Sequence, residues 1–410
     1  MEGVHVMKCK RVILLTTGFP YGTGENFISA ELDAMPEDVM LDIIPFMFSK
    51  SDVCRTVPSN VTIVDDCRVA QCKFKKIIYS LRTLVCNDFW REIRKRDDIT
   101  CKKFFQVLGF YSRSLELFYM LKKKYADEIK TKNAIFYSYW LLEGAYTVSL
   151  LQKKYGVRSY SRAHRVDVWD GMSAYGLVPA RSATLENITS VFVCSKDGQT
   201  YLRDMNPQYA DKFQISYLGT KDYGWASGDN RGKEFVVVSC ARIEPVKRVE
   251  LLAEALRCIT DKRIHWIHFG DGSCRKKVEE MIARLPSNIE VSLMGTTQHD
   301  DVMAYYCRNA VNLFVNTSSS EGLPVSIMEA ISFGIPVIAT DVGGTREIVN
   351  KDTGTLISAD FAPEDLAAYI SDYIKKDSVS YCIDRETVRK FWENNFAAKA
   401  NYDSFYRNMM

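Results

Sequence analysis

Short apolar runs alternate with stretches of helical spacing in the second half of the chain. Runs rich in β-branched and aromatic residues predict strands over residues 235–240, 265–269, 291–294, 311–315 and 337–340. Strands that alternate with helices form a parallel sheet with helices on both faces. Such a sheet binds its ligands at the carboxyl ends of its strands.

The first half shows the same alternation, so the predicted fold class is α/β throughout. Strands are predicted over 11–17, 40–45, 61–64, 134–137, 191–194 and 215–219, with the end of another strand and its loop in 160–167. Helices are predicted over 25–35 and 141–155 in this half, and over 362–375 and 386–406 at the end of the chain. A chain of 410 residues is too long for one ordinary core. We therefore expect two domains, 1–220 and 233–385, joined by a linker over 221–232 that is rich in Gly, Asp and Ser.

Composition indicates a globular protein whose partners depend on local surfaces. The formal net charge is only +3, so the overall charge predicts neither nucleic-acid nor membrane binding. The twelve cysteines form no C-x-x-C pair and no cluster at metal-ligand spacing, and we interpret them as reduced thiols. No segment has the uninterrupted apolar length of a spanning helix, and the start lacks the apolar core of a signal peptide. These features predict a cytoplasmic protein.

Residues 316–340 combine a loop, a helix and a strand with side chains that can carry chemistry. Pro324 lies where the helix begins, and Gly334 follows its end. The free backbone N–H groups at a helix start can bind a phosphate. Glu321 precedes this helix and Glu329 lies on it. Read from the residues alone, Glu321 is explained equally well as a capping or dipole partner and Glu329 as a solvated helix residue.

The spacing S-x-x-E-G-L-P-x-S-x-x-E-A in this segment resembles the donor-binding motif of the retaining glycosyltransferases of family 4, within the glycosyl transferases group 1, which have the GT-B fold. The second half also resembles this family in R-x-x-x-x-K, at Arg242 and Lys247, and in D-V-G-G-x-x-E-I from residue 341. In the first half, FPYGTGENFISAEL and RAHRVDVW are similar to family segments. The resemblance implies two Rossmann-like, doubly wound domains that face a cleft. It assigns acceptor binding to 1–220, nucleotide-sugar binding to 233–385, and a helix over 386–410 that returns to the first domain.

The resemblance also implies roles for individual residues. The implied catalytic residues are His164 and Glu321, with Glu321 at hydroxyls of the donor sugar. The residues implied to bind the donor diphosphate are Arg242, Lys247, Gly322, Leu323 and Gly24. Those implied to bind the donor nucleoside are Glu329, Met294 and Gly295, and those implied on the acceptor side are Asp167, Gly22 and Thr23. The residues themselves leave simpler explanations open, because an isolated histidine is commonly structural and an aspartate in a loop can be a cap.

The chemistry of sugar transfer agrees with this set. Cleavage of the anomeric C–O bond leaves a diphosphate, and cations and backbone amides can stabilise its growing charge without a metal. The sequence has no D-x-D pair or carboxylate cluster that would indicate Mg²⁺, so we expect neither a metal nor a cofactor. The predicted reaction is retaining transfer from a UDP- or GDP-sugar to a hydroxyl of a glycan or lipid-linked glycan, in cell-surface polysaccharide biosynthesis. Two alternatives are a GT-B nucleotide-sugar 2-epimerase, which needs no acceptor, and a non-catalytic nucleotide-sugar-binding module.

Residues 73–124 are rich in lysine, arginine and aromatic residues. The stretch predicts two helices with a basic, aromatic face. This face is explained either as a peripheral contact with an anionic membrane or as the solvated outside of helices whose aromatic residues face their own core. A membrane contact would place the protein at the inner face of the membrane. No recognition motif supports a nucleic-acid partner.

Overall fold

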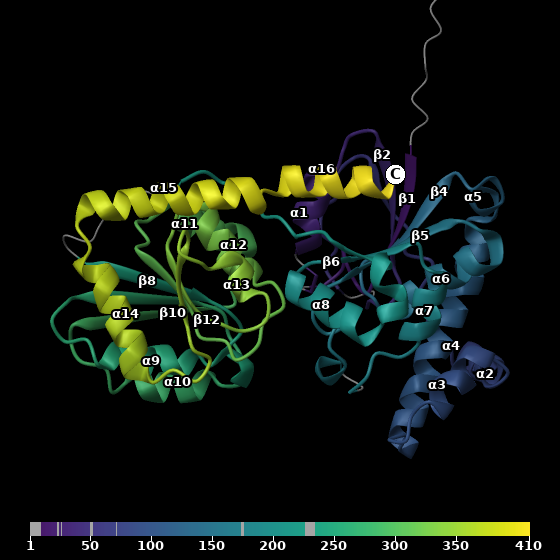
Figure 1. Ribbon diagram of the computed structural model, residues 1–410, viewed down its shortest axis with the longest axis horizontal. Helices are drawn as coiled ribbons and strands as arrows, with labels where there is room; N and C mark the ends of the chain where they lie inside the picture. The colour runs from purple at the N-terminus through teal and green to yellow at the C-terminus, as the bar shows by residue number, and fades with distance from the viewer. Residues whose placement is uncertain are drawn as a thin grey trace, which may run out of the picture. The chain divides into compact units, whose positions relative to one another are not determined.

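The computed structural model describes residues 10–22, 24–25, 27–49, 52–70, 72–173, 176–225 and 234–410. The chain divides into two compact units. The first unit comprises residues up to Ser216 together with Tyr402–Met410, and the second unit comprises Tyr217–Asn401. Each unit contains one parallel sheet with helices packed on it (Figure 1). The short return of the chain into the first unit begins within the last helix.

The sheet of the first unit has the order β3-β2-β1-β4-β5-β6-β7, and all of its neighbouring strands are parallel. Its strands are β1 Lys10–Thr16, β2 Val39–Pro45, β3 Val61–Ile63, β4 Ala134–Ser138, β5 Arg158–Ala163, β6 Ser190–Val193 and β7 Phe213–Ile215. The strand order reverses between β1 and β4, where Leu14 pairs with Tyr137. Ligands of doubly wound sheets bind outside the carboxyl ends of the strands at such a reversal.

The helices of the first unit cover this sheet and extend beyond it. They are α1 Phe27–Asp33, α2 Lys73–Leu84, α3 Asn87–Arg94, α4 Cys101–Lys124, α5 Ala126–Thr131, α6 Glu143–Tyr155, α7 Arg181–Asn187 and α8 Lys196–Met205. On one face of the sheet, fully buried Ile13, Phe136 and Leu151 belong to a continuous apolar core. Ser195 caps α8, since its hydroxyl accepts a hydrogen bond from the backbone N–H of Gly198 at 3.1 Å.

The second unit repeats the doubly wound arrangement with the order β10-β9-β8-β11-β12-β13. Its strands are β8 Phe235–Cys240, β9 Ile264–Phe269, β10 Ile289–Gly295, β11 Leu313–Asn316, β12 Val337–Thr340 and β13 Gly354–Ile357. Its helices are α9 Val249–Arg257, α10 Arg275–Ile282, α11 His299–Arg308, α12 Val325–Ser332, α13 Thr345–Ile348, α14 Pro363–Lys375 and α15 Ser378–Asn395. The strand order reverses between β8 and β11, and both strands point their carboxyl ends toward the predicted site.

Helix α12 follows its sequence signals closely. Pro324 is the residue that flanks the helix start, one position earlier than predicted. Gly334 follows the C-cap residue with φ +70°, the left-handed conformation that glycine adopts at least cost. The helix has eight residues and buries Ile327, Met328 and Ile331. Its start is thereby fixed at the carboxyl edge of the sheet.

Several predicted elements differ from the observed ones. The predicted helix over 386–406 is two helices, α15 and α16 (Ala398–Met409), because the chain bends at Phe396, where φ is −131°. The predicted strand over 215–219 is β7, which lies earlier in the chain and spans Phe213–Ile215. The basic stretch 73–124 contains three helices, α2 to α4, instead of two. Strand β13 was missed because its four residues begin with glycine and threonine.

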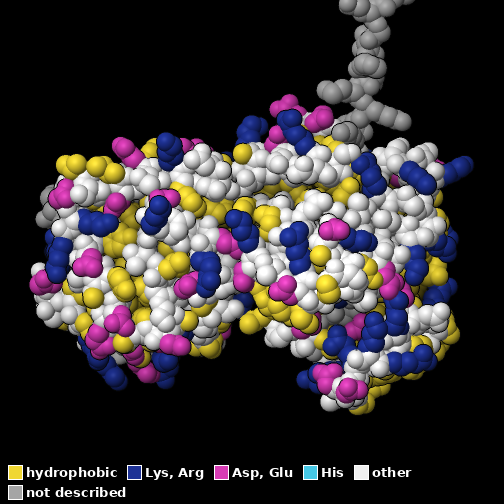
Figure 2. Space-filling view, viewed as in Figure 1, with side chains coloured by type: hydrophobic (Ala, Val, Ile, Leu, Met, Phe, Trp, Pro, Cys, Tyr) yellow, Lys and Arg dark blue, Asp and Glu magenta, His cyan; other side chains and the backbone are white. Residues whose placement is uncertain are grey.

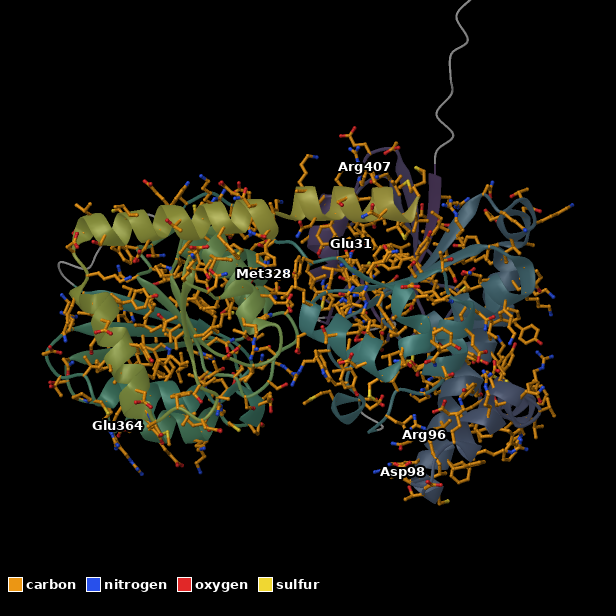
Figure 3. The ribbon with its side chains drawn as sticks, in the orientation of Figure 1. Glu31, Arg96, Asp98, Met328, Glu364 and Arg407 are labelled. Atoms are coloured by element: carbon orange, nitrogen blue, oxygen red, sulfur yellow. The ribbon has the colours of Figure 1, made fainter. Side chains whose placement is uncertain are left out.

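The C-terminal segment is bound to the first unit through a buried ion pair. Arg162 on β5 and Glu31 on α1 lie 3.5 Å apart (Nη2 to Oε2), and both side chains are fully buried. The Tyr406 hydroxyl donates to Glu31 at 3.2 Å, and the Arg162 guanidinium lies 4.2 Å from the ring centre of Phe405. Figure 3 shows Glu31 below α16 and Arg407 on the other side of that helix. Within the described ranges, no helix is long and apolar enough to cross a membrane.

Candidate functional site

Glu321 is fixed at the carboxyl edge of the second sheet by two donors. Lys247 Nζ lies 2.6 Å from Glu321 Oε1, and Asn316 Nδ2 donates to the same oxygen at 3.3 Å. The carboxylate is buried, with 8% of the residue exposed. The oxygen Oε2 has no hydrogen-bond partner among the described residues. One oxygen of the carboxylate is therefore held in place while the other remains available.

The loops after β8 and β11 are tied together around this pair. Arg248 adopts a left-handed conformation with φ +48°, and its Nε donates to the Thr317 carbonyl at 2.8 Å. The Thr317 hydroxyl donates to the carbonyls of Lys247 and Arg248, each at 3.0 Å. The Ser319 N–H donates to the Val246 carbonyl at 2.8 Å. These bonds make the two loops one frame, which fixes the direction of Lys247.

The loop after β12 supports Glu321 from a third side. Gly343 has φ +52°, and a Cβ atom there would lie 2.0 Å from the Glu321 carbonyl oxygen. The Gly344 N–H donates to the Gly322 carbonyl at 2.8 Å. Only glycine allows this close approach. The D-V-G-G segment therefore packs directly against the loop that carries Glu321.

The start of α12 presents two free backbone donors. The N–H groups of Gly322 and Leu323 donate to no residue in the described parts of the chain. Both residues are buried and lie directly after Glu321. Unused amides at a helix start, beside a lysine, provide the donors that a phosphate oxygen needs.

Arg242 lies in the same loop as Lys247 but differs in its surroundings. Its side chain is exposed and forms no salt bridge with a described residue, while its carbonyl accepts from Glu244 N–H at 2.9 Å. Glu244 itself accepts from the Ser273 hydroxyl at 2.6 Å. Arg242 is therefore free to reach an anionic ligand, and Lys247 is held in position.

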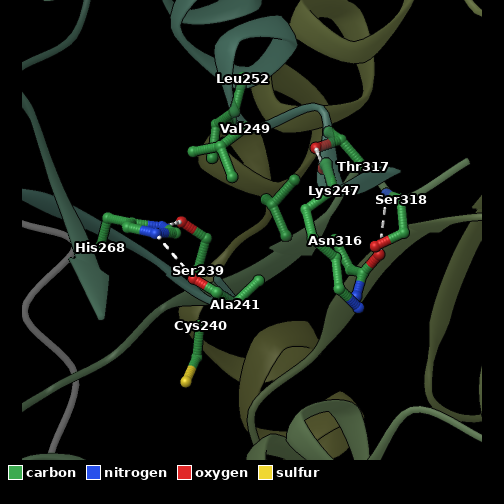
Figure 4. Close-up of a pocket in the computed structure, with 11 residues that line it drawn as sticks. Ser239, Cys240, Ala241, Lys247, Val249, Leu252, His268, Asn316, Thr317 and Ser318 are labelled. Atoms are coloured by element: carbon green, nitrogen blue, oxygen red, sulfur yellow. Dashed lines mark hydrogen bonds between the residues drawn. The ribbon is translucent and has the colours of Figure 1, made fainter. Parts of the chain in front are cut away.

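A small cavity lies beneath these loops, between the ends of β8, β9 and β11 (Figure 4). Its volume is about 10 Å³, enough for one water molecule but not for a diphosphate. His268 Nδ1 lies 2.8 Å from Ser239 Oγ, and His268 Nε2 lies 3.1 Å from the Ala241 carbonyl. Burial lowers the pKa of His268 to about 4, so the ring is neutral at physiological pH. The cavity is therefore too small to be the binding site for a phosphorylated ligand.

The predicted nucleoside contacts lie further along the same edge. Glu329 Oε1 lies 2.8 Å from His299 Nε2, and this hydrogen bond is the largest reason that the pKa of His299 is raised. Met294 is half exposed at the end of β10, and Gly295 has φ +68° while its carbonyl accepts from Gly270 N–H. His299 was not predicted as a site residue, because nothing in its local sequence links it to a glutamate thirty positions away.

In the first unit, His164 lies in an aromatic cage. The ring centres of Trp140 and Tyr139 lie 4.6 and 4.9 Å from that of His164, and Phe27 lies at 5.6 Å. Burial lowers the pKa of His164, and Asp167 opposes this shift because its Oδ2 lies 3.8 Å from Nδ1, beyond hydrogen-bond distance. A neutral ring at the end of β5, with neither nitrogen hydrogen-bonded in the described structure, fits a group that contacts a ligand.

The Asp167 side chain accepts hydrogen bonds from the local backbone. Its Oδ1 accepts from His164 N–H at 2.8 Å and its Oδ2 accepts from Leu141 N–H at 2.9 Å. The residue is fully buried. This geometry favours the loop-cap explanation over the acceptor-side role, because both carboxylate oxygens already accept hydrogen bonds and none of the residue faces solvent.

The glycine loop after β1 is held by two charged residues that the sequence did not indicate. Glu25 Oε2 accepts from the N–H groups of Gly18 and Phe19 at 2.8 and 2.7 Å. Arg55 Nη2 donates to the carbonyls of Gly22 and Gly24 at 2.6 and 2.9 Å. The loop is therefore fixed in shape. The remaining predicted acceptor-side residue, Thr23, lies outside the described residues.

The structure thus brings Lys247, Glu321, Gly322 and Leu323 together in the second unit, with Arg242 on the same loop. Glu329 forms a separate contact with His299. His164, Asp167, Gly22 and Gly24 belong to the first unit. Among the described residues, no group of three or more His, Cys, Asp or Glu side chains could hold a metal ion.

Residues 226–394 match the family described as Glycosyl transferases group 1. The UDP-N-acetylglucosamine–peptide N-acetylglucosaminyltransferase GtfA subunit of Streptococcus agalactiae is 30% identical over 149 residues, 35% of this chain and 28% of that protein. The lipopolysaccharide 1,6-galactosyltransferase of Escherichia coli K12 is 27% identical over 177 residues, 42% of this chain and 45% of that protein. The matched part spans less than half the length of either relative.

Solved structures resemble the chain over nearly its full length. Sucrose-phosphate synthase from Thermosynechococcus elongatus has a TM-score of 0.70 at 17% identity and covers 98% of this chain and 99% of its own. HepE from Anabaena, crystallised with UDP, has a TM-score of 0.65 at 15% identity with the same coverage. At these identities the likeness concerns the fold. Together with the two doubly wound parallel sheets, it confirms the predicted GT-B fold class.

Proposed function

We propose that this chain, whose residues 226–394 match the glycosyl transferases group 1, is a glycosyltransferase that acts on a nucleotide-diphosphate sugar. The donor is a UDP- or GDP-sugar and the acceptor is a hydroxyl of a glycan or lipid-linked glycan. One observation carries the proposal: Lys247 and Glu321 are in contact beside the unused amides of Gly322 and Leu323. A cation, two N–H donors and a carboxylate at one sheet edge suit a diphosphate joined to a hydroxyl-rich sugar.

Lys247 can serve the carboxylate and the donor at once. An ammonium group has three N–H donors, and Glu321 Oε1 uses one of them in this structure. The others are available to diphosphate oxygens, with Arg242 as a second cation and Gly24 as a further predicted contact. The free Glu321 oxygen is then placed to accept from a sugar hydroxyl. Glu329, Met294 and Gly295 are assigned to the nucleoside, with Glu329 at the ribose.

The proposed reaction retains the configuration of the transferred sugar. The bond between the anomeric carbon and the diphosphate oxygen breaks, and the acceptor oxygen attacks from the same face. The proton of the acceptor hydroxyl passes to the departing phosphate oxygen. Lys247, Arg242 and the two amides stabilise the charge that develops on the diphosphate, and no metal or cofactor takes part. His164, kept neutral by burial, is assigned a hydrogen bond near the sugar.

We assign the acceptor to cell-surface polysaccharide biosynthesis at the inner face of the membrane, with 73–124 as the membrane-contacting region. A lipopolysaccharide galactosyltransferase among the relatives supports a glycan of this kind. Lysines in the first turn of α2 and the last turn of α4 supply cations to this region. Lipid-linked glycans are presented at such a surface.

The test is nucleotide release from a panel of UDP- and GDP-sugars, measured with and without acceptor glycans. Release that depends on an acceptor, with a product of retained anomeric configuration, is the expected result. Interconversion of two free nucleotide sugars without an acceptor would identify a 2-epimerase instead. Binding of a nucleotide sugar with no turnover of any kind would identify a non-catalytic module.

A further inference from the structure

Helix α2 turns its apolar face to solvent. Phe74, Ile77 and Leu81 are spaced as one helical stripe and are 69%, 59% and 60% exposed. Leu84 and Val85, at the end of the helix, continue the same stripe and are also exposed. Figure 1 places α2 at the outer edge of the lobe that α2, α3 and α4 form. A helix of a globular domain normally buries such a stripe.

The opposite face of α2 makes the contacts with the rest of the unit. Thr83 is the buried residue of this helix. The Arg82 guanidinium lies 4.5 Å from the ring centre of Tyr119 on α4, and the rings of Tyr79 and Tyr119 are 6.0 Å apart. The helix is thus anchored through a largely polar face, which leaves its apolar stripe without an intramolecular role.

The charges of α2 are also unexplained by folding. The helix has four cationic side chains and no acidic one, and Lys73, Lys75 and Lys76 all lie in its first turn. Cations at a helix start oppose the helix dipole, so these lysines weaken the isolated helix. Figure 2 shows lysine and arginine side chains gathered over the α2–α4 lobe. An external anionic surface would offset the unfavourable interaction of these lysines with the helix dipole and the repulsion among the lysines themselves.

The aromatic residues of the neighbouring helices behave differently. Phe89 on α3, and Phe110 and Tyr111 on α4, are fully buried in one core cluster. For these residues the structure favours the explanation in which aromatic side chains face their own core. Within 73–124, helix α2 is therefore the part that can contact a membrane. Phe105 of α4 is a further exposed aromatic residue in this region.

We propose that α2 lies in the interface of an anionic lipid surface. Phe74, Ile77 and Leu81 enter the boundary between headgroups and acyl chains, and the three first-turn lysines contact lipid phosphates. A second copy of the chain is a poorer occupant, because a two-fold interface would bring the same lysines face to face. This inference deepens the proposed function, and it rests on that function only for the lipid-linked acceptor.

The experiment is flotation of the full chain with vesicles of phosphatidylcholine, alone or mixed with phosphatidylglycerol. One variant carries Phe74→Ser, Ile77→Ser and Leu81→Ser, and a second carries Lys73→Gln, Lys75→Gln and Lys76→Gln. The control carries Val379→Ser and Ile383→Ser on α15, whose side chains are 70% and 58% exposed. Circular dichroism and thermal unfolding establish that all three variants fold.

Binding to anionic vesicles at low salt, lost at high salt and absent on neutral vesicles, is the expected result. Each α2 variant should bind at least about tenfold more weakly, while the control binds as the wild type does. Failure of the wild type to bind anionic vesicles, or wild-type binding by either α2 variant, would overturn the proposal. Self-association that the α2 variants abolish, without vesicle binding, would assign the stripe to a second copy instead. Nucleotide release with a soluble acceptor needs no vesicle, so failure of the transferase function is seen separately.

Discussion

The Glu321 carboxylate is the residue on which the proposed donor site depends most. Its Oε1 is shared by Lys247 and Asn316, and its Oε2 has no described partner. Such an arrangement fixes the direction of the carboxylate before a ligand arrives. A preorganised charge of this kind contributes to catalysis because it needs no reorientation during the reaction.

The substitution Glu321→Gln keeps an oxygen acceptor but removes the charge that holds Lys247. We expect kcat/KM for the donor to fall by about tenfold to a thousandfold, because Lys247 and the sugar hydroxyl both lose their ionic partner. Steady-state nucleotide release measures this. Glu290→Gln is the matched control, since Glu290 is 56% exposed and pairs with Arg263 on the surface of the same unit. Transfer at the wild-type rate by Glu321→Gln would remove the catalytic assignment.

The contact between His299 and Glu329 predicts a pH dependence of stability. The pKa of His299 is raised above its ordinary 6.5, chiefly by the hydrogen bond with Glu329. A raised pKa in the folded state means that the stabilisation is fully present below pH 6.5 and is lost as the pH rises through the folded pKa. The difference in free energy of unfolding between wild type and Glu329→Gln should therefore shrink as the pH rises from about 6 to 8.

NMR titration of the His299 ring provides the direct check. In Glu329→Gln the pKa of His299 should fall toward its ordinary value, since the main cause of the shift is removed. His299 also faces Asp300, at 3.6 Å from Nδ1, and the ring of Tyr223, and these contacts remain in the variant. An unchanged pKa of His299 in Glu329→Gln would mean that Asp300 or another group, and not Glu329, raises it.

Three loops at the carboxyl edge of the second sheet act as a single frame. The loops after β8 and β11 exchange hydrogen bonds through Arg248 and Thr317. The loop after β12 contacts the same frame through Gly343. A disturbance in any one loop should therefore displace Glu321, even where the substituted residue does not face the ligand.

Gly343→Ala tests this frame. The alanine Cβ would lie 2.0 Å from the Glu321 carbonyl oxygen, at a φ of +52°. We expect the free energy of unfolding to fall by about 2 kcal/mol and nucleotide binding to weaken, because the Glu321 loop must move. Gly171→Ala is the control, since its Cβ would have no neighbour within 4 Å. Denaturant unfolding and calorimetry measure both effects, and a neutral Gly343→Ala would contradict the frame.

The periodicity of the chain predicted most elements but not their orientation. The apolar runs at Phe235–Cys240 and Val337–Thr340 are strands as expected, because both are buried on two faces of a parallel sheet. The basic, aromatic face predicted over 73–124 allowed two explanations, because the pattern of residues does not tell which side of a helix faces the core. Strand β13 was too short and too polar to predict from its residues alone.

The candidate site was predictable where a motif carried it. Glu321 and Lys247 lie in contact, as neighbouring strand ends of one sheet allow. Arg55 and His299 were missed because each acts on a partner about thirty positions away, Gly24 and Glu329 respectively. Contacts of this kind depend on how loops fold back, which local sequence does not specify.

The chain leaves the first unit after Ser216, forms the second unit and returns to the first within α16. The returning residues contact a buried charge network instead of a purely apolar surface. Breaking one partner of a buried ion pair is costly because the other charge remains without compensation. The return of the C-terminus is therefore expected to be sensitive to a single residue of the first unit.

Arg162→Met should lower the free energy of unfolding of the first unit by about 3–5 kcal/mol, because Glu31 would keep a buried, unpaired charge. The double variant Arg162→Met, Glu31→Leu should recover part of this loss. Arg407→Met is the control on α16, since that arginine is 76% exposed and its pair with Asp403 is worth less than about 1 kcal/mol. Equal effects of Arg162→Met and Arg407→Met in denaturant unfolding would contradict a structural role for the buried pair.

We infer that Lys247 binds the diphosphate of a sugar nucleotide at the carboxyl edge of the second sheet. Isothermal titration calorimetry with UDP- and GDP-sugars tests it most directly, on the wild type, Lys247→Ala and the control Lys276→Ala, whose side chain is exposed on α10. We predict that the wild type and Lys276→Ala bind one of these donors alike and that Lys247→Ala binds it at least about tenfold more weakly. Unchanged binding by Lys247→Ala, or no binding of any sugar nucleotide by the wild type, would contradict the claim.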